Sequence, residues 1–362
     1  MRNEIIQPEK QRPQRKKGLF HKIILGGLGI AIVISLIIAF LLYKTMFLPN
    51  VQTPNHEDFS FYIRTGAGFN EVKQNLLNQG LIADKNSFLW LAERKNYPAK
   101  VKAGRYILRN GMSNEALINL LRSGAQTAIK LTFNNVRDIR QLAGRISKQI
   151  EADSISLLQM MNNNDFLQKS GFRHETIPAM FLPNTYEFYW NTNSEAFVSR
   201  MFQEYLNFWN ENRKKKAKTI QLSPVEVSVL ASIIDRETSV DSEKAMIAGV
   251  YLNRLKDNWL LQADPTLIFA LNDYSIRRVL DVHKNIESKY NTYKYPGLPP
   301  GPICIPTLSA IEAVLNYQKH NYYYFCAKDD FSGKHAFAKT YNEHIVNARK
   351  FQQALNKQKI YR

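Results

Sequence analysis

Residues 23–43, from Ile23 to Tyr43, form an apolar run that contains no charged side chain. An α-helix rises about 1.5 Å per residue, so a run of this length crosses a bilayer core of about 30 Å. A cleaved signal peptide has a shorter apolar core and small residues at its exit, whereas this run continues into Lys44, Thr45 and Met46. The sequence therefore predicts one transmembrane helix over residues 23–43.

Charge predicts the orientation of this helix. Basic residues precede the run, and they are Arg12, Arg15, Lys16, Lys17 and Lys22. By the positive-inside rule, residues 1–22 form a cytoplasmic tail of an inner-membrane protein, and the bulk of the chain is periplasmic or otherwise extracytoplasmic. The whole chain has 49 Lys and Arg against 31 Asp and Glu, a net charge of +18, which favours an anionic partner. The extracytoplasmic placement argues against nucleic acid.

The rest of the chain predicts a linker and two domains of α+β class. Residues 44–57 contain Pro49 and Pro54 without periodicity, which is typical of a linker. Residues 58–126 have a β-α-α-β-α order, with strands at 59–63 and 104–108, a helix after residue 68 closed by Gly80, a helix after Asp84 and a helix capped by Ser113. Residues 127–362 form a second domain of mixed α+β type.

The stretch 222–266 carries the residue with the clearest catalytic character, Glu237. Ser223, Pro224 and Glu226 have the pattern of a helix start: a hydroxyl N-cap, a proline at the first position and an acid at the third. Apolar residues then fill most of the helix circumference up to Ile234. Glu237 follows at the margin of this apolar surface. Desolvation raises the pKa of a carboxyl group, so Glu237 is predicted to be a proton donor.

Several further motifs follow in order over residues 222–344. They are LASIIDRET, which contains Glu237, then LQADPT, YNTY, GLPPGPI and GKHAFAKTYNEH. Together these motifs resemble the endolytic murein transglycosylases, the MltG or YceG-like family, and the resemblance extends from about Phe59 to about Phe351. It implies that residues 58–126 form a LysM-like, glycan-contacting module, although this module could serve only as a spacer. The resemblance also implies that residues 127–362 form the catalytic domain.

The resemblance also implies the activity. A membrane-anchored lytic transglycosylase, a lyase, would cleave the MurNAc–GlcNAc bond inside nascent peptidoglycan strands, leave 1,6-anhydro-MurNAc ends and so limit strand length, near the peptidoglycan synthases. Glu237 maps onto the single catalytic glutamate. The motif around Phe181 departs from the family pattern, because Ala179 and Met180 stand in place of Glu-Gly and Asn184 in place of Asp.

The residues leave other interpretations open. Asp235 is two residues from Glu237 and points about 200° away on a helix. Asp241 is predicted to be the N-cap of a helix over 242–255, and Asp264 to lie in a turn before Pro265. A hydrolysing muramidase that uses Asp264 as a second acid is one alternative. A glycan-binding scaffold without activity is another.

The remaining polar motif residues are candidates for sugar contacts or for plain structure. The candidates for substrate binding are Gln262, Asp264, Asn291, Thr292 and Tyr293, with the Gly-Pro run at 297–302 as a rigid wall. His335 and His344 are interpreted as hydrogen-bonded structural residues, and Cys304 and Cys326 as buried, unpaired thiols. No pattern for a metal or a cofactor is present in the sequence.

Overall fold

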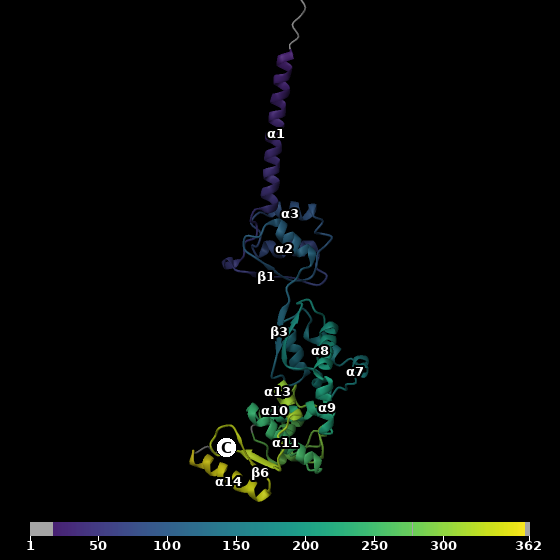
Figure 1. The fold of residues 1–362 in the computed structure, drawn as a ribbon, viewed down its shortest axis with the longest axis vertical. Coiled ribbons are helices and arrows are strands. Elements are labelled where there is room, and N and C mark those ends of the chain that lie inside the picture. Colours follow the sequence, from purple (N-terminus) through teal and green to yellow (C-terminus); the bar gives the residue numbers. More distant parts are fainter. Residues whose placement is uncertain (1–16, 277, 359–362) are drawn as a thin grey trace, which may run out of the picture. The chain divides into compact units, whose positions relative to one another are not determined.

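The computed structural model of the chain describes residues 17–276 and 278–358, in two compact units that comprise residues 1–127 and 128–362 (Figure 1). The boundary falls one residue after the one expected from the sequence. Most of the expected cytoplasmic tail, residues 1–16, lies outside the described residues. The class is α+β, as predicted, because helices surround three separate two-stranded antiparallel sheets in the described chain.

The first unit begins with one long helix, α1 (Lys17–Phe47). Its part from His21 to Phe47 contains an 18-residue stretch with a mean hydropathy of 2.9 and is long and apolar enough to cross a membrane. Its apolar side chains from Ile23 to Leu42 are exposed, as expected of a surface that faces lipid rather than a protein core. The helix is therefore consistent with the predicted single-pass anchor.

After α1 the chain folds into a small α+β module in the predicted order. Its elements are β1 (Phe59–Ile63), α2 (Phe69–Asn78), α3 (Lys85–Arg94), β2 (Gly104–Leu108) and α4 (Asn114–Ser123). Strands β1 and β2 pair antiparallel, with Phe61 opposite Tyr106. Asp84 and Ser113 cap α3 and α4 through their side chains, as their sequence positions predicted. Both paired residues, Phe61 and Tyr106, are buried in the core of this module.

The segment expected to be a linker, residues 44–57, is largely structured. Residues 44–47 are the end of α1 and residues 49–53 are part of this module, so that prediction is wrong for both. Pro49 forms a β-bridge with Ser113, and Val51 forms one with Ile82. Asn50 is buried, and its Nδ2 donates to the Asn114 Oδ1 at 2.7 Å. A 3₁₀ turn, η1 (Pro54–His56), follows. Proline suggested a flexible connection, but these backbone bridges are long-range contacts that no local pattern reveals.

The second unit contains the remaining elements. Its N-terminal part holds β3 (Ile129–Phe133), α5 (Ile139–Ile146), α6 (Ser154–Met161), α7 (Asn164–Ser170), η2 (Ile177–Met180), β4 (Asn184–Phe188), α8 (Ser194–Phe208) and α9 (Glu211–Thr219). Its C-terminal part holds α10 (Pro224–Glu237), α11 (Asp241–Lys256), α12 (Asp264–Leu271), η3 (Asp281–Asn285), α13 (Leu308–Leu315), β5 (Tyr324–Ala327), β6 (His335–Ala338) and α14 (Tyr341–Lys357). Strands β3 and β4 pair antiparallel, and β5 and β6 form a hairpin.

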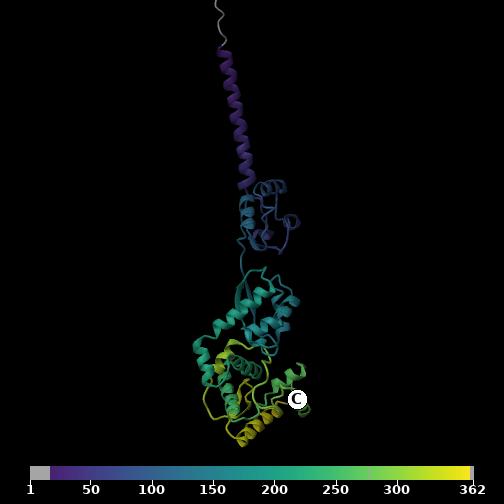
Figure 2. The ribbon, with the colours of Figure 1, turned by 90° about the vertical axis from the view of Figure 1, so that its right-hand side faces the viewer.

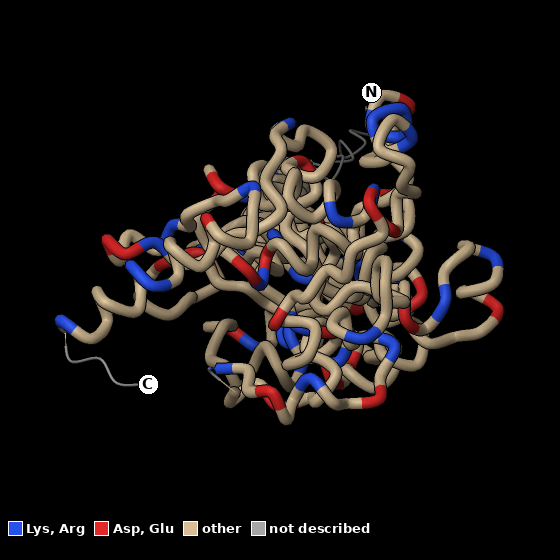
Figure 3. Tube along the Cα trace, turned by 90° about the horizontal axis from the view of Figure 1, so that it is seen from below, with Lys and Arg blue, Asp and Glu red and all other residues tan. Residues whose placement is uncertain are grey.

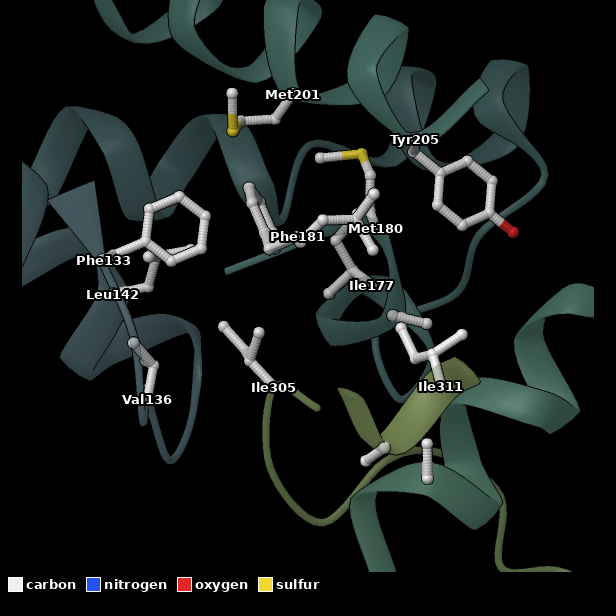
Figure 4. Packing of buried hydrophobic residues seen from close by; sticks show 14 of the residues in the cluster. Phe133, Val136, Leu142, Ile177, Met180, Phe181, Met201, Tyr205, Ile305 and Ile311 are labelled. Atoms are coloured by element: carbon white, nitrogen blue, oxygen red, sulfur yellow. The ribbon is translucent and has the colours of Figure 1, made fainter. Parts of the chain in front are cut away.

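Helix α10 contacts α11, α12, α13 and α9. In Figure 2 the teal N-terminal part of this unit lies above its green and yellow C-terminal part. One apolar core joins the two parts of the unit, because Ile305 and Ile311 pack into the same cluster as Phe133 and Met180 (Figure 4). The departures from the family motif fall here. Ala179 and Met180 are fully buried, and an acid at either position would have to be desolvated.

Charged residues of both signs are distributed along the described chain. Figure 3 shows Lys and Arg segments interspersed with Asp and Glu segments along the trace. Many are neighbours in sequence, such as Lys214 with Glu211 and Lys284 with Asp281. Exposed pairs of this kind contribute little to stability, about 0–1 kcal/mol each.

Candidate active site

Helix α10 begins at the predicted residue. The Ser223 Oγ accepts from the Glu226 backbone N–H at 3.2 Å, and the Glu226 carboxylate accepts from the Ser223 N–H at 2.8 Å. This reciprocal capping box, with Pro224 as the first helical residue, fixes where the helix starts. Residues 227–234 are all buried, so α10 enters the core and reaches Glu237 only in its last turn.

Glu237 is half-buried at the end of this apolar helix. The Tyr251 hydroxyl donates to its Oε1 at 2.6 Å, and in the described part of the chain this is its only side-chain hydrogen bond. Burial raises the pKa of Glu237 to about 7; the negative charge of Asp264 adds to the increase, while the Tyr251 hydrogen bond and the charge of Arg254 oppose it. A carboxyl group with this pKa is substantially protonated at neutral pH and can both donate and accept a proton.

Tyr251 and Arg254 lie on α11, and sequence reasoning missed both. Burial raises the pKa of the Tyr251 phenol well above its usual value, so it remains a hydrogen-bond donor. The Arg254 guanidinium is buried and held by two backbone carbonyls, that of Tyr323 at 2.8 Å and that of Leu261 at 2.5 Å. The signal was present in the predicted helix, because Ile247, Tyr251 and Arg254 recur at i, i+4 and i+7 and share one face.

Asp264 and Tyr293 complete this group. Asp264 is the first residue of α12 rather than part of a turn, and its exposed carboxylate accepts from the Tyr293 hydroxyl at 2.5 Å. Burial raises the pKa of Tyr293, and the bond to Asp264 raises it further. We call Glu237, Tyr251, Arg254, Asp264 and Tyr293 the Glu237 side of α10. The structure thus brings together three of the predicted site residues with two that were not predicted.

Asn291 and Thr292 lie beneath this group instead of at the surface. Asn291 is fully buried and donates to the backbone carbonyls of Lys284 and Ile286 at 2.8 and 2.9 Å. Thr292 is also buried, and its hydroxyl accepts from the Ala263 N–H at 3.0 Å. Their polar atoms are occupied within the protein. Thr292 supports the loop that carries Gln262 and Asp264, whereas Asn291 holds the preceding segment, residues 284–293.

Gln262 is exposed, with its backbone in the left-handed region at φ 50°. Its N–H donates to the Thr292 carbonyl at 3.0 Å, which fixes this unusual backbone conformation. The buried Thr292 therefore holds two consecutive backbone N–H groups just before α12. Of the predicted contact residues, Gln262, Asp264 and the half-buried Tyr293 have surface available to a ligand.

Asp235 faces a different set of partners, and we call Asp235, Lys244 and Thr307 the Asp235 side of α10. Lys244 Nζ lies 2.7 Å from the Asp235 Oδ1, and both side chains are more than nine-tenths buried. Thr307 donates both its N–H, at 2.5 Å, and its hydroxyl, at 2.8 Å, to the same carboxylate. Asp235 thus ties α10 to α11 and to the start of α13.

Asp241 is the first residue of α11, not its N-cap, so that prediction was off by one position; the N-cap is Val240. Its carboxylate lies 2.8 Å from the Lys244 Nζ and accepts from the Ser309 hydroxyl at 3.0 Å. An acid in the first turn of a helix is stabilised by the helix dipole without being the cap. Asp241 therefore belongs with the Asp235 side, as an exposed second partner of Lys244.

The histidines and cysteines have structural surroundings. The backbone N–H of His335 donates to the Glu243 carboxylate at 2.9 Å, and the ring Nδ1 lies 3.1 Å from the same carboxylate, as the structural interpretation predicted. His344 stacks on Tyr324, but its buried Nδ1 has no partner among the described residues, so its predicted hydrogen bond is absent. Cys304 and Cys326 are both free; Cys304 is buried, whereas Cys326 is only half-buried.

The Gly-Pro run lies away from Glu237. Residues 297–300 line a cavity of about 1390 Å³ together with Leu222, Val225 and Val229, near the beginning of α10. Gly301 packs so closely on the Glu175 carbonyl that a Cβ would lie 1.9 Å from its oxygen. The Ile303 N–H donates to the Ser232 Oγ at 2.9 Å. The motif therefore runs along α10 from its beginning to Ser232, and among the described residues no printed contact joins residues 297–302 to Glu237.

Comparisons with known proteins show the family of this chain. The sequence model of the YceG-like family matches residues 61–350. An endolytic murein transglycosylase of Bacillus subtilis is 29% identical over 323 residues, covering 84% of this chain and 88% of that protein. One from Streptococcus pneumoniae is 26% identical over 320 residues, covering 79% of this chain and 57% of that protein.

A solved structure is also similar. The crystal structure of a YceG-like protein from Listeria monocytogenes, at 2.6 Å, matches with a TM-score of 0.55 and 26% identity. The match covers 80% of this chain and 98% of that one. The likeness therefore extends over both the small module and the unit that contains Glu237.

Proposed function

Because the chain belongs to the YceG-like family, we propose that it is a lytic transglycosylase that cleaves peptidoglycan, with Glu237 as its acid and base. The name shared by the curated relatives supports the reaction class. The observation that carries the residue assignment is the pKa of Glu237, which burial raises to about 7. A group with this pKa can protonate a leaving oxygen and then take up a proton as a carboxylate.

The reaction that we propose is the cleavage of a MurNAc–GlcNAc bond inside a glycan strand. Glu237 protonates the glycosidic oxygen as the bond to the muramic C1 breaks, and the N-acetyl group of the substrate stabilises the cationic centre. The C6 hydroxyl of the same muramic ring then attacks C1, and its proton passes to the Glu237 carboxylate. The product end is 1,6-anhydro-MurNAc, no water is consumed, and Glu237 regains its starting protonation state.

In this reaction the neighbours of Glu237 are proposed to position its carboxyl group, stabilise its charge or contact the sugar. Tyr251 holds one carboxyl oxygen at 2.6 Å and leaves the other for the substrate. Arg254 supplies a fixed positive charge that favours the carboxylate after the first proton transfer. Gln262, Asp264 and Tyr293 are proposed to contact sugar, since they are the predicted residues with accessible surface.

A hydrolysing muramidase is the second candidate, and one observation favours it. The charge of Asp264 raises the pKa of Glu237, which places a second carboxylate near the first. Asp264, however, is exposed and accepts a hydrogen bond from Tyr293. A carboxylate at such a place could activate a water molecule, and this alternative predicts a different product.

The membrane anchor defines where the reaction would occur. We propose that α1 spans the inner membrane once, with its N-terminal end in the cytoplasm, so that the small module and the second unit lie on the outer side, where the wall is. On that side the enzyme would act on new strands beside the peptidoglycan synthases and limit their length. A reporter that is active only in the cytoplasm, fused after residue 362, should give no signal; a strong signal would reverse the orientation.

The product distinguishes the two reactions. The full chain in detergent is incubated with purified glycan strands in water enriched in heavy oxygen, and the fragments are identified by mass. A C6 hydroxyl held beside C1 has an effective molarity that reaches roughly 10⁵ M, so ring closure should outcompete water. The new muramic ends should be unlabelled and lighter by one water than hydrolysed ends. Labelled reducing ends as the main product would establish the muramidase instead.

A further inference from the structure

The end of α1 is fastened to the module that follows it. The Asn114 Nδ2 donates to the Thr45 carbonyl at 2.9 Å, and Met46 packs against the core of the module. Helix α1 touches both α3 and α4. Since Tyr43 is the last residue of the apolar run, the folded module begins within one helical turn of the point where the run ends.

This attachment limits how far the module can stand from the bilayer. From Tyr43 to Phe47 the helix rises about 6 Å. The polar headgroup layer on each side of a bilayer is about 5–7 Å thick. If α1 spans the membrane as proposed, the elements that contact its last turn therefore lie at the level of the headgroups.

One face of α3 is directed towards the end of α1. The Ser87 Oγ accepts from the Asn114 Nδ2 at 3.0 Å, and this amide is the one that donates to Thr45. Trp90 and Arg94 follow Ser87 at i+3 and i+7, so the three residues share a face. Phe88, on another face, is buried in the core of the module.

The chemistry of this α3 face, Ser87 with Trp90 and Arg94, suits a lipid headgroup layer. Trp90 is 40% exposed, and the Arg94 guanidinium lies 5.5 Å from its ring centroid. Trp is enriched where hydrocarbon meets headgroups, because its ring is apolar and its N–H is polar. Arg binds phosphate while its apolar stem remains in the interface.

We propose that the α3 face binds the phospholipid headgroups of the membrane that α1 spans. The inference rests on the proposed anchor and adds a second attachment to it. One helix alone leaves the module free to tilt about its last turn, whereas two attachments fix its orientation on the bilayer. The partner is the lipid phosphate layer, with Trp90 at its inner boundary and Arg94 on the phosphates.

The test measures how close Trp90 lies to lipid. The full chain is reconstituted into vesicles of phosphatidylcholine and phosphatidylglycerol that contain a lipid with a nitroxide on its headgroup, which quenches nearby Trp fluorescence. The difference between the natural chain and Trp90→Phe isolates the Trp90 signal. Trp259→Phe is the matched control, because Trp259 is 43% exposed but lies in the second unit.

We expect the Trp90 signal to be quenched several-fold more strongly than the Trp259 signal, and less by a nitroxide at the end of the acyl chain. Arg94→Glu should weaken the quenching of Trp90, because a negative charge is repelled by the phosphates. A Trp90 signal without quenching, or quenching that Arg94→Glu leaves unchanged, would overturn the proposal. Flotation with the vesicles tests the anchor separately: a protein that floats without quenching of Trp90 keeps the anchor and loses this contact, and one that does not float loses both.

Discussion

The last turn of α10 separates two regions that each contain a carboxylate, and the two are stabilised in opposite ways. On the Asp235 side, a buried lysine and two Thr307 donors surround the carboxylate at 2.5 to 2.8 Å. On the Glu237 side, a neutral phenol is the bonded partner, and the pKa rises to about 7. The two residues are separated by one position in sequence but point about 200° apart.

The difference shows how one helix can carry two acids with different roles, one that stabilises the fold and one that can exchange protons. A carboxylate with a buried cation and several donors is stabilised in its charged form and holds elements together. A desolvated carboxyl group with one neutral donor is free to change its protonation state. Substitutions at the two acids and at their partners can therefore separate the structural role from the catalytic one.

The largest expected effect is the loss of cleavage in Glu237→Gln. The amide preserves shape and the Tyr251 contact but removes the titrating proton, so cleavage should fall at least about a hundredfold, the scale of a general acid. Asp235→Asn is the matched control two residues away and should keep most of the activity of the folded protein. Fragment release from glycan strands measures both. Equal losses in the two variants would show that Glu237 is not the acid.

The next effect is on stability and belongs to the other side of α10. Asp235→Asn leaves Lys244 buried without its nearest counter-charge, which should lower the free energy of unfolding by about 3 kcal/mol. Asp241→Asn removes an exposed partner of the same lysine and should cost less than about 1 kcal/mol. Urea unfolding, followed by the fluorescence of the buried Trp209, measures both. If the two variants lose similar amounts of unfolding free energy, Asp235 contributes no more to stability than Asp241 does.

A smaller effect links stability to pH. The folded-state pKa of Glu237 lies above its ordinary value of 4.5, so the stability that its neutral form provides is present below about 4.5 and is lost as pH rises through about 7. The side chain in Glu237→Gln carries no charge at any pH. The variant should therefore gain stability relative to the natural chain between pH 4.5 and 8, by about 2 kcal/mol after allowance for partial exposure. A pH-independent difference in unfolding free energy would contradict this.

The smallest expected effects are two shifts of opposite sign in the pH profile of cleavage. The Tyr251 hydrogen bond lowers the pKa of Glu237, so Tyr251→Phe should move the alkaline limb to higher pH. The charge of Asp264 raises that pKa, so Asp264→Asn should move the limb to lower pH. A purely structural role for Tyr251 would change the rate without moving the limb. A complete loss of activity in Asp264→Asn would instead favour the muramidase.

Prediction from sequence succeeded where interactions are local. The start of α10 follows from Ser223, Pro224 and Glu226, which bond within one turn, and the caps of α3 and α4 follow from Asp84 and Ser113 for the same reason. Prediction was poorer for loops. Residues 49–53 were interpreted as a linker from proline content, but their partners, such as Ile82 and Ser113, lie tens of residues away.

The sequence by itself determined that the chain has one apolar helix fit to span a membrane, that a buried helix ends in Glu237, and that the family motifs occur in order. Only the tertiary structure decided what surrounds that glutamate. Tyr251 comes from the next helix, 14 residues on, and the buried Thr292 holds the loop before Asp264. The physical reason is range: capping and hydropathy act within a few residues, whereas desolvation and hydrogen bonding at Glu237 depend on how α10, α11 and α12 pack.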